Sequence, residues 1–206
     1  IMKIYFDGCS WTKGEELENQ EEERYSKLIC DELGAEETNL AIKGGSNDRI
    51  VRNLLVENHI EEYDLAVIQM TLPVRTEYYM IRKGEYYDKC WIRVNPSNNY
   101  SRWLHGLDGD IRKLGEKFTD HNNFWKYWYM NITNKKFFDV KEKIHFETIK
   151  SYCETKGVPL IICSINTWSK LKFDFVLTVD NNTKCKMGHP NKLGHQLIAK
   201  VMLDKI

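Results

Sequence analysis

Four short segments of the chain carry the residue types that acyl transfer needs. Ser10 lies in the glycine-flanked turn DGCSWTKG, and His189 comes directly before Pro-Asn. Residues 43–47 hold a double glycine, and residues 71–75 hold a threonine, a proline and an arginine. A nucleophile, a base and donors for an oxyanion are the groups that acyl transfer requires. The four segments therefore indicate a catalytic site, provided that the fold brings them together.

Apolar runs alternate with amphipathic segments along the chain. The runs predict strands at residues 2–6, 38–42, 64–70, 160–163 and 173–179. The amphipathic segments predict helices at residues 19–33, after a cap at Ser46 or Asn47, at 135–155, and after Pro190. Such alternation is typical of an α/β fold with a mostly parallel sheet covered on both faces. Ligands of these sheets bind beyond the carboxyl ends of the strands, where the four segments lie.

Helical spacing also predicts which side chains face the core. The predicted core positions are Ile50, Leu54 and Leu55 in the second helix, Phe137, Val140, Ile144, Thr148 and Tyr152 in the third, and Leu193, Leu197, Ile198, Val201 and Met202 in the last. His195, in the last helix, is expected to pack rather than to take part in chemistry.

The stretch from residue 72 to residue 134 departs from this alternation. It is polar and contains Tyr78, Tyr79, Tyr86, Tyr87, Trp91, Tyr100, Trp103, Phe124, Trp125, Tyr127, Trp128 and Tyr129. Disordered segments are poor in aromatic residues, so we expect an inserted cap that packs over the scaffold. Packing is the ordinary role of such residues, and a platform on which sugar rings stack is the alternative.

Three segments resemble blocks of the SGNH/GDSL hydrolases and occur in that family's order. FDGCSWTKG looks like the first block, in which a strand runs into G-D-S-x-T-x-G. NLAIKGGSN is similar to the second, which ends in an oxyanion-hole glycine. GHPNKLGHQLIAKVM is similar to the last, which holds the catalytic histidine before an asparagine and the final helix. The resemblance implies a three-layer α/β/α, flavodoxin-like fold.

The resemblance also implies hydrolysis of an ester through an acyl-enzyme. Ser10 would attack the carbonyl carbon, and His189 would accept its proton and pass it to the leaving alcohol. The backbone N–H of Ser10 and that of Gly44 or Gly45 would hold the oxyanion. The family's third block, G-x-N-D, reads MTLPVR here, so Thr71 is the nearest side chain that could complete the oxyanion hole.

Two positions near the nucleophile and the base depart from the family's pattern. Lys186 stands three residues before His189, where the family has an aspartate. Asp180 is therefore the expected orienting acid, and a Ser–His dyad oriented by a backbone carbonyl is the alternative. Cys9 stands where the family's first block has its aspartate. A cysteine nucleophile is thus an alternative to Ser10, although no Cys/His signature accompanies it.

Two further residues are expected to bind substrate. Arg75 follows the strand at residues 64–70 and could hold an anionic part of the substrate. The alternative for Arg75 is a surface or cap salt bridge. Trp11 comes directly after the nucleophile and is the second expected substrate contact.

Composition limits the partners and the cofactors. The 30 basic and 30 acidic side chains cancel, so no net field favours nucleic acid or anionic lipid. No apolar run is long enough for a transmembrane helix, and no signal peptide is evident. The six cysteines form no C-x-x-C pair and the histidines show no metal-ligand spacing. We therefore expect a cytoplasmic protein with no metal, no cofactor and no nucleic-acid or membrane partner. The divergence of the sequence blocks from the SGNH/GDSL pattern makes association with a phage one option.

The sequence thus predicts one SGNH-like domain over residues 1–206 that acts as a serine esterase. Small acyl groups on a carbohydrate, such as O-acetyl, are the favoured substrates. Lipid or phospholipid esters are an alternative, and so is a binding protein on the same scaffold that lacks strong catalysis. A nucleotide or flavin binder is disfavoured because no G-x-G-x-x-G follows the first strand. The oligomeric state stays open.

Overall fold

The computed structural model describes the chain except for residues 82–88, 95–103, 106–122 and 125. The centre of the described part is a five-stranded sheet with the order β2-β1-β3-β7-β8, in which every neighbouring pair is parallel. Its strands are β1 (Lys3–Asp7), β2 (Glu36–Asn39), β3 (Leu65–Met70), β7 (Leu160–Ser164) and β8 (Phe175–Val176). All five lie at the predicted places, with ends that differ by a few residues.

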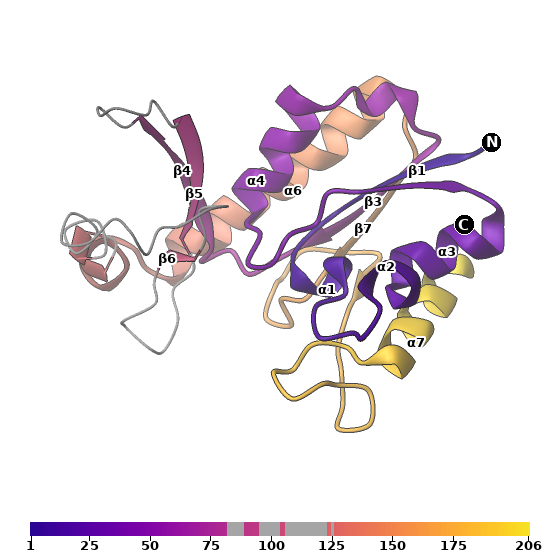
Figure 1. Ribbon diagram of the computed structural model, residues 1–206. Coiled ribbons are helices and arrows are strands. Elements are labelled where there is room, and N and C mark those ends of the chain that lie inside the picture. The colour runs from indigo at the N-terminus through magenta and orange to yellow at the C-terminus, as the bar shows by residue number, and fades with distance from the viewer. Residues whose placement is uncertain (82–88, 95–103, 106–122, 125) are drawn as a thin grey trace.

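Helices cover both faces of the sheet. Figure 1 shows α4 and α6 on one face and α3 and α7 on the other. The helices of the described part are α1 (Ser10–Lys13), α2 (Gln20–Glu23), α3 (Tyr25–Leu33), α4 (Asn47–Arg52), the π-helix η1 (Asn53–Glu57), the 3-10 helix η2 (Ile60–Glu62), the π-helix η4 (Trp128–Ile132), α6 (Lys135–Lys156) and α7 (Lys192–Leu203). The expected three-layer α/β/α fold is confirmed.

The central strand β3 shows why the sheet is covered on both sides. All six of its residues are buried, and its alternate side chains enter two separate apolar clusters. Leu65 and Val67 pack under α3 and α7, whereas Ala66 and Ile68 pack under α4 and α6. Successive side chains of a strand point to opposite faces, so an unbroken apolar run is what two covering layers require.

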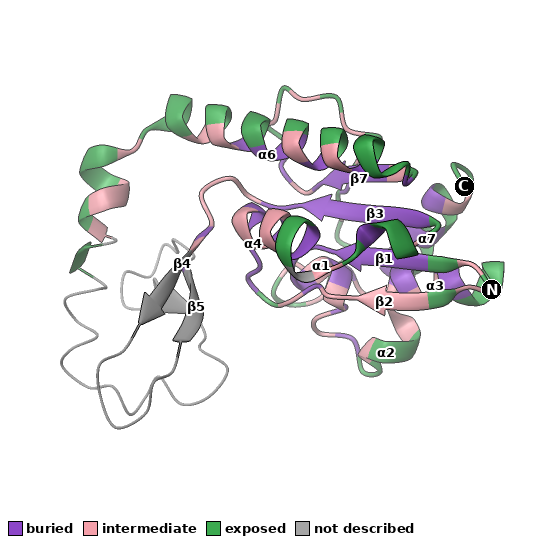
Figure 2. Cartoon of the chain, turned by 90° about the horizontal axis from the view of Figure 1, so that it is seen from above, coloured by how far each residue is buried: buried purple, intermediate pink, exposed green. Residues whose placement is uncertain are grey.

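Helix α6 has the predicted bounds but a different buried face. Its buried residues are Glu142, His145, Phe146, Ile149 and Cys153. The predicted residues Phe137, Val140 and Ile144 are exposed, with relative accessibilities of 43–59%, and green outward turns of α6 are visible in Figure 2. The prediction was wrong because two polar residues of the buried stripe, Glu142 and His145, have polar partners inside the protein.

Smaller differences occur at the other helices. In α7 the buried residues are Gly194, His195, Ile198, Ala199 and Met202, so the predicted Leu193, Leu197 and Val201 are half exposed. Leu55 is exposed because the chain continues α4 as the π-helix η1, which rotates the side chains that follow. The single helix predicted over residues 19–33 is divided at Arg24, whose backbone is extended.

Part of residues 72–134 forms a second, three-stranded antiparallel sheet beside the main one (Figure 1). Its strands are β4 (Thr76–Ile81), β5 (Lys89–Val94) and β6 (Leu104–His105). Arg52 of α4 binds Glu77 at 2.7 Å, and the Thr76 hydroxyl donates to Asp48 at 2.6 Å, which ties the start of β4 to the scaffold. Most of the aromatic side chains of this stretch, for which we expect packing in a cap and a sugar platform as the alternative, are not among the side chains that the structure describes.

None of the helices that the structure describes has the length and apolar character needed to cross a membrane.

Candidate active site

The structure brings Ser10 and His189 together. Ser10 is the first residue of α1, directly after β1, and His189 lies in the loop that leads into α7. The Nε2 atom of His189 is 2.9 Å from the Oγ atom of Ser10, although 179 residues separate them. That distance lies within the range in which an imidazole can take a proton from a hydroxyl.

A carboxylate lies on the other side of the same imidazole. The Oε2 atom of Glu16 is 2.7 Å from Nδ1 of His189, and Oε1 accepts a hydrogen bond from the backbone N–H of Met187 at 3.0 Å. A carboxylate only accepts hydrogen bonds, so Nδ1 carries the proton and Nε2 is left to accept from Ser10. Desolvation opposes the ionisation of Glu16, but the hydrogen bonds from His189 and Met187 outweigh it and lower its pKa.

The backbone of Glu16 is held in an unusual conformation. Its φ angle is 73°, and among the described residues it is the only one other than glycine with a positive φ. This region costs a non-glycine residue about 1–2 kcal/mol, so surrounding contacts must hold it there. The hydrogen bonds from Met187 and His189 are such contacts, and they join the loop after α1 to the loop before α7.

The expected orienting acid, Asp180, lies elsewhere. Its Oδ1 atom accepts hydrogen bonds from the backbone and hydroxyl of Thr183 and from the backbone of Asn182, all at 2.8–2.9 Å. Asp180 therefore stabilises its own turn, and the carboxylate beside the His189 imidazole is that of Glu16. Sequence reasoning missed Glu16 because the run GEELENQEEE offers several equivalent acids and no signal that selects one.

Gln69, another residue that the sequence analysis missed, supports the turn that carries Ser10. Its Oε1 atom accepts a hydrogen bond from the Thr12 hydroxyl at 2.7 Å and from the backbone N–H of Cys9 at 3.4 Å. Its Nε2 atom lies 3.4 Å from the Cys9 sulfur. Gln69 is fully buried at the end of β3, so it fixes α1 to the neighbouring strand.

Cys9 is fully buried beneath Ser10. Its sulfur lies 3.9 Å from Ser10 Oγ and close to the Gln69 amide. Burial raises the pKa of this thiol, but the charge of the Arg75 guanidinium and the hydrogen bonds from Trp11, Gln69 and Arg75 together outweigh burial, so the net shift is downward. The exposed fraction of Cys9 is 0%, against 4% for Ser10, and the imidazole of His189 is hydrogen bonded to Ser10. These contacts favour Ser10 over Cys9 as the nucleophile.

The double glycine approaches the turn that carries Ser10 closely. The N–H of Gly45 donates to the carbonyl of Ile42 at 3.0 Å, so it is already occupied in a turn. A Cβ atom on Gly45 would lie 2.7 Å from the backbone oxygen of Gly8, which leaves no room for a side chain. Gly44 has a φ of 68° and, among the residues that the structure describes, its N–H has no hydrogen-bond partner. Gly44 is thus better suited than Gly45 to donate to an oxyanion.

A buried ion pair holds these two loops together. Asp7, at the end of β1, accepts from Arg49 Nη1 at 2.9 Å and from the N–H of Gly8 at 2.7 Å. The same guanidinium donates through Nη2 to the carbonyl of Leu40 at 2.7 Å. Asn53 completes the environment of Asp7 with a hydrogen bond of 2.8 Å. Arg49 therefore positions the glycine loop relative to the turn that carries Ser10.

Thr71 lies at the same edge of the sheet but is fully buried. Its main chain is held by the Asn47 side chain, which donates to the Thr71 carbonyl at 3.1 Å and accepts from its N–H at 2.8 Å. The Thr71 hydroxyl accepts from Arg75 Nη1 at 2.5 Å. Arg75 is partly exposed, so substrate can approach its guanidinium more readily than the Thr71 hydroxyl.

Trp11, the other expected substrate contact, is partly buried and packs against the apolar cluster under α3 and α7. His195 is fully buried, stacks on Tyr25 and accepts a hydrogen bond from its backbone N–H at 3.1 Å, which is a packing role. Within the described part of the chain, His, Cys, Asp and Glu form no group of three or more that could hold a metal ion.

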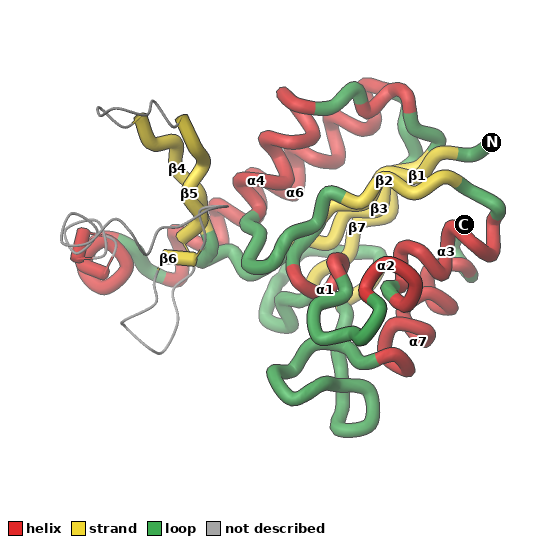
Figure 3. The backbone as a smooth tube through the Cα atoms, viewed as in Figure 1, coloured by secondary structure: helices red, strands yellow, loops and turns green. Residues whose placement is uncertain are grey.

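The loops that carry these residues gather at the carboxyl ends of the strands, with α1 among them (Figure 3).

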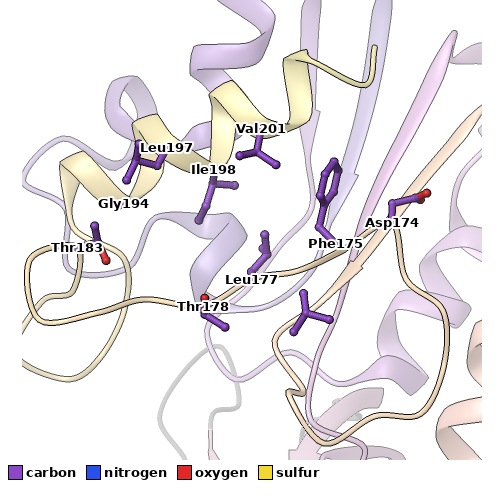
Figure 4. Close-up of a pocket in the computed structure, with 10 residues that line it drawn as sticks. Asp174, Phe175, Leu177, Thr178, Thr183, Gly194, Leu197, Ile198 and Val201 are labelled. Carbon is purple, nitrogen blue, oxygen red and sulfur yellow. The ribbon is translucent and has the colours of Figure 1, made fainter.

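A separate pocket of about 440 Å³ lies between β8 and α7 (Figure 4). Its lining is mostly apolar and includes Phe175, Leu177, Ile198 and Val201, and it contains neither Ser10 nor His189. The pocket is therefore distinct from the Ser10–His189 pair.

Comparison with solved structures identifies the fold. A carbohydrate esterase whose active site displays divergent catalytic and non-catalytic binding functions is similar over 99% of this chain and 64% of its own, with a TM-score of 0.56 and 10% identity. A family two carbohydrate esterase from Clostridium thermocellum in complex with cellohexaose is similar over 100% of this chain and 63% of its own, with a TM-score of 0.51 and 16% identity. The chain shares the fold of these two carbohydrate esterases.

A lipolytic protein of the G-D-S-L family from Desulfitobacterium hafniense DCB-2 is also similar, over 100% of both chains, with a TM-score of 0.45 and 13% identity. This chain spans less than two thirds of the length of the two carbohydrate esterases. No protein-family model and no curated protein matches the sequence. The three-layer α/β/α fold that the three sequence blocks imply is the fold that the comparisons with the two carbohydrate esterases support.

Proposed function

We propose that the protein is a serine esterase that uses Ser10 as nucleophile, His189 as base and Glu16 as the acid that orients the base. The observation that carries this proposal is the continuous set of contacts from Glu16 through His189 to Ser10, at 2.7 and 2.9 Å. Three groups in this order are what an activated serine requires.

In the first half of the reaction, Ser10 Oγ attacks the ester carbonyl carbon while its proton passes to Nε2 of His189. The carbonyl oxygen becomes an oxyanion, which the backbone N–H groups of Ser10 and Gly44 stabilise. Glu16 stabilises the imidazolium that forms. The C–O bond to the alcohol then breaks, and Nε2 returns the proton to the departing oxygen.

In the second half, a water molecule takes the place of the alcohol. His189 accepts a proton from this water, whose oxygen attacks the acyl carbon bound to Ser10 Oγ. The tetrahedral intermediate collapses, the bond from carbon to Oγ breaks, and the proton on Nε2 goes to Ser10. The acid is released and the enzyme returns to its starting state.

The proposed substrates are O-acetyl or other small acyl groups on a carbohydrate. The support is that the two solved structures with the same fold are carbohydrate esterases, one of them in complex with cellohexaose. Lipid or phospholipid esters are the alternative substrates.

A fluorophosphonate probe tests the nucleophile directly, because it labels activated serines. We expect labelling of Ser10 in the unaltered protein, and loss of both labelling and 4-nitrophenyl acetate hydrolysis in Ser10→Ala, by at least about a thousandfold in kcat. Ser151→Ala, at an exposed position on α6, is the matched control. Cys9→Ala should retain labelling. Equal rates for the unaltered protein and Ser10→Ala would instead indicate a binding protein on this scaffold.

A further inference from the structure

Arg75 is a guanidinium without a carboxylate partner in the part of the chain that the structure describes. Its Nη1 atom donates to the Thr71 hydroxyl at 2.5 Å, and its Nε atom is buried with no hydrogen-bond partner. A guanidinium has five N–H donors and is always charged. Arg75 therefore holds a positive charge and unused donors at a partly buried position.

The other arginines of the scaffold are arranged differently. Arg24 meets Glu37 at 2.7 Å, Arg49 meets Asp7 at 2.9 Å, and Arg52 meets Glu77 at 2.7 Å. Removing a charge from water without a partner costs several kcal/mol, which is why buried arginines are usually paired. The salt bridge that was the alternative for Arg75 is not found among the described residues.

The position of Arg75 places its charge beside the nucleophile. Arg75 follows β3, the strand that lies next to β1 in the sheet, and β1 leads into Ser10. Among the groups that lower the pKa of Cys9, the Arg75 guanidinium has the largest effect, so it lies close to that sulfur. The Cys9 sulfur is in turn 3.9 Å from Ser10 Oγ.

We infer that Arg75 binds a carboxylate on the substrate, so that the preferred substrates are small acyl esters of acidic sugars such as uronic acids. This inference rests on the proposed esterase function. A guanidinium matches a carboxylate in shape, since two parallel N–H groups can bind its two oxygens. One guanidinium also balances the single charge of a carboxylate. The nearby ammonium of Lys141 is already paired with Asp48 at 2.8 Å, so it adds little charge for a doubly charged phosphate.

A matched pair of substrates tests this inference. The pair is a mono-O-acetylated methyl glucoside and the methyl glucuronoside acetylated at the same position, which differ only in the carboxylate. The quantity measured is the ratio of their kcat/KM values, acidic over neutral. The variants are Arg75→Gln, which removes the charge, and Arg75→Lys, which keeps it but removes the planar fork. The control is Arg52→Gln, which removes a guanidinium already paired with Glu77.

We expect the unaltered protein to prefer the acidic substrate, and Arg75→Gln to lower the ratio by about tenfold to a hundredfold. Arg75→Lys should give an intermediate ratio, and Arg52→Gln should leave the ratio unchanged. An equal loss on both substrates in Arg75→Gln would overturn the inference, because a residue that stabilises the oxyanion affects both alike. A ratio near one in the unaltered protein would also overturn it.

A binding measurement separates failure of this inference from failure of the proposed function. Titration calorimetry of Ser10→Ala with the unacetylated methyl glucuronoside and methyl glucoside does not depend on hydrolysis. Tighter binding of the glucuronoside, lost when Arg75→Gln is added, would support the carboxylate site even if the protein has no esterase activity. Equal binding of the two sugars, together with equal kcat/KM values, would overturn the carboxylate site and leave the esterase function intact.

Discussion

The Oε2 atom of Glu16 lies 2.7 Å from Nδ1 of His189, so the loop that follows Ser10 also supplies the carboxylate beside the imidazole. Glu16 comes six residues after Ser10, whereas His189 comes from the far end of the chain. The His189 imidazole thus lies between two side chains of residues 10–16, those of Ser10 and Glu16. The contacts of Gln69 and the positive φ of Glu16 help to hold this segment in place. Lys186 stands where the SGNH/GDSL pattern has an aspartate, but the His189 imidazole still has a carboxylate beside it, that of Glu16.

Replacing Glu16 with glutamine should slow the chemical step. The amide has nearly the same shape, but it does not stabilise the imidazolium, and through its NH₂ it can favour the wrong tautomer of His189. We expect Glu16→Gln to lower kcat on 4-nitrophenyl acetate by about two orders of magnitude, with a small change in KM. Steady-state kinetics measure both.

The control for this variant is Glu15→Gln, because Glu15 is the adjacent acid and binds Lys43 instead of the imidazole. It should keep the kcat of the unaltered protein. Glu16→Asp should recover part of the activity, since it restores the charge on a shorter side chain. If Glu16→Gln retained full kcat, the orienting role of Glu16 would be wrong, and His189 would act in a Ser–His dyad.

Gly45 should tolerate no side chain, although its N–H is used within its own turn. A Cβ atom would lie 2.7 Å from the backbone oxygen of Gly8, and backbone yields less readily than a flexible side chain. We expect Gly45→Ala to destabilise the protein by about 1–3 kcal/mol and to lower kcat, because the glycine loop must move away from the nucleophile turn. Urea unfolding and steady-state kinetics measure the two effects.

Gly34→Ala separates loss of stability from loss of activity. Gly34 ends α3 with a φ of 61°, so alanine is strained there, but nothing lies within 4 Å of its added Cβ. The variant should lose stability and keep its kcat. Should Gly45→Ala match Gly34→Ala in both respects, the close approach of the glycine loop would have no role in catalysis.

The strands and the meeting of Ser10 with His189 could be predicted because local sequence determines the segments that carry them. The run LAVIQM allows little other than a strand buried on both faces, and the turn after β1 and the loop before α7 keep recognisable blocks. The long helix α6 was predicted, but not the side of it that is buried. The helix has an apolar stripe at Phe137, Val140 and Ile144, but the stripe that is buried includes Glu142 and His145. Which stripe faces the core depends on the residues of other elements that contact the helix.

The residues that were missed act through contacts that are distant in sequence or that many residues could make. In the sequence Gln69 is one polar residue in an apolar strand. Its structural role depends on hydrogen bonds from Cys9 and Thr12, about sixty residues earlier. Glu16 is distinguished from its acidic neighbours by its contact with His189 and by the positive φ that its loop adopts, and the sequence indicates neither. Asp180 is predicted as the orienting acid because it is close to His189 in the sequence. In the folded protein its carboxylate instead accepts hydrogen bonds from Thr183 in its own turn.

Finally, His195 should make the protein less stable in acid. Burial lowers the pKa of this histidine from 6.5 to about 4, and the charge of Glu23 opposes the shift only in part. In the unfolded chain the imidazole gains a proton below about pH 6.5, whereas in the folded protein it stays neutral until about pH 4. The unfolded state therefore binds more protons in this window, and the free energy of unfolding falls as the pH is lowered, by up to about 3 kcal/mol from this residue.

Urea unfolding at a series of pH values measures this contribution when His195→Asn is compared with the unaltered protein. Asparagine keeps an acceptor for the backbone N–H of Tyr25, which His195 Nδ1 binds at 3.1 Å, but it does not titrate. The variant should be less stable at pH 7.5 because it loses the stacking on Tyr25, and its stability should fall less between pH 6.5 and 4. Asp48, with a pKa lowered to about 2, loses its contribution mainly below this window and does so in both proteins. Parallel curves for the two proteins from pH 6.5 to 4 would show that His195 titrates alike in the folded and unfolded states.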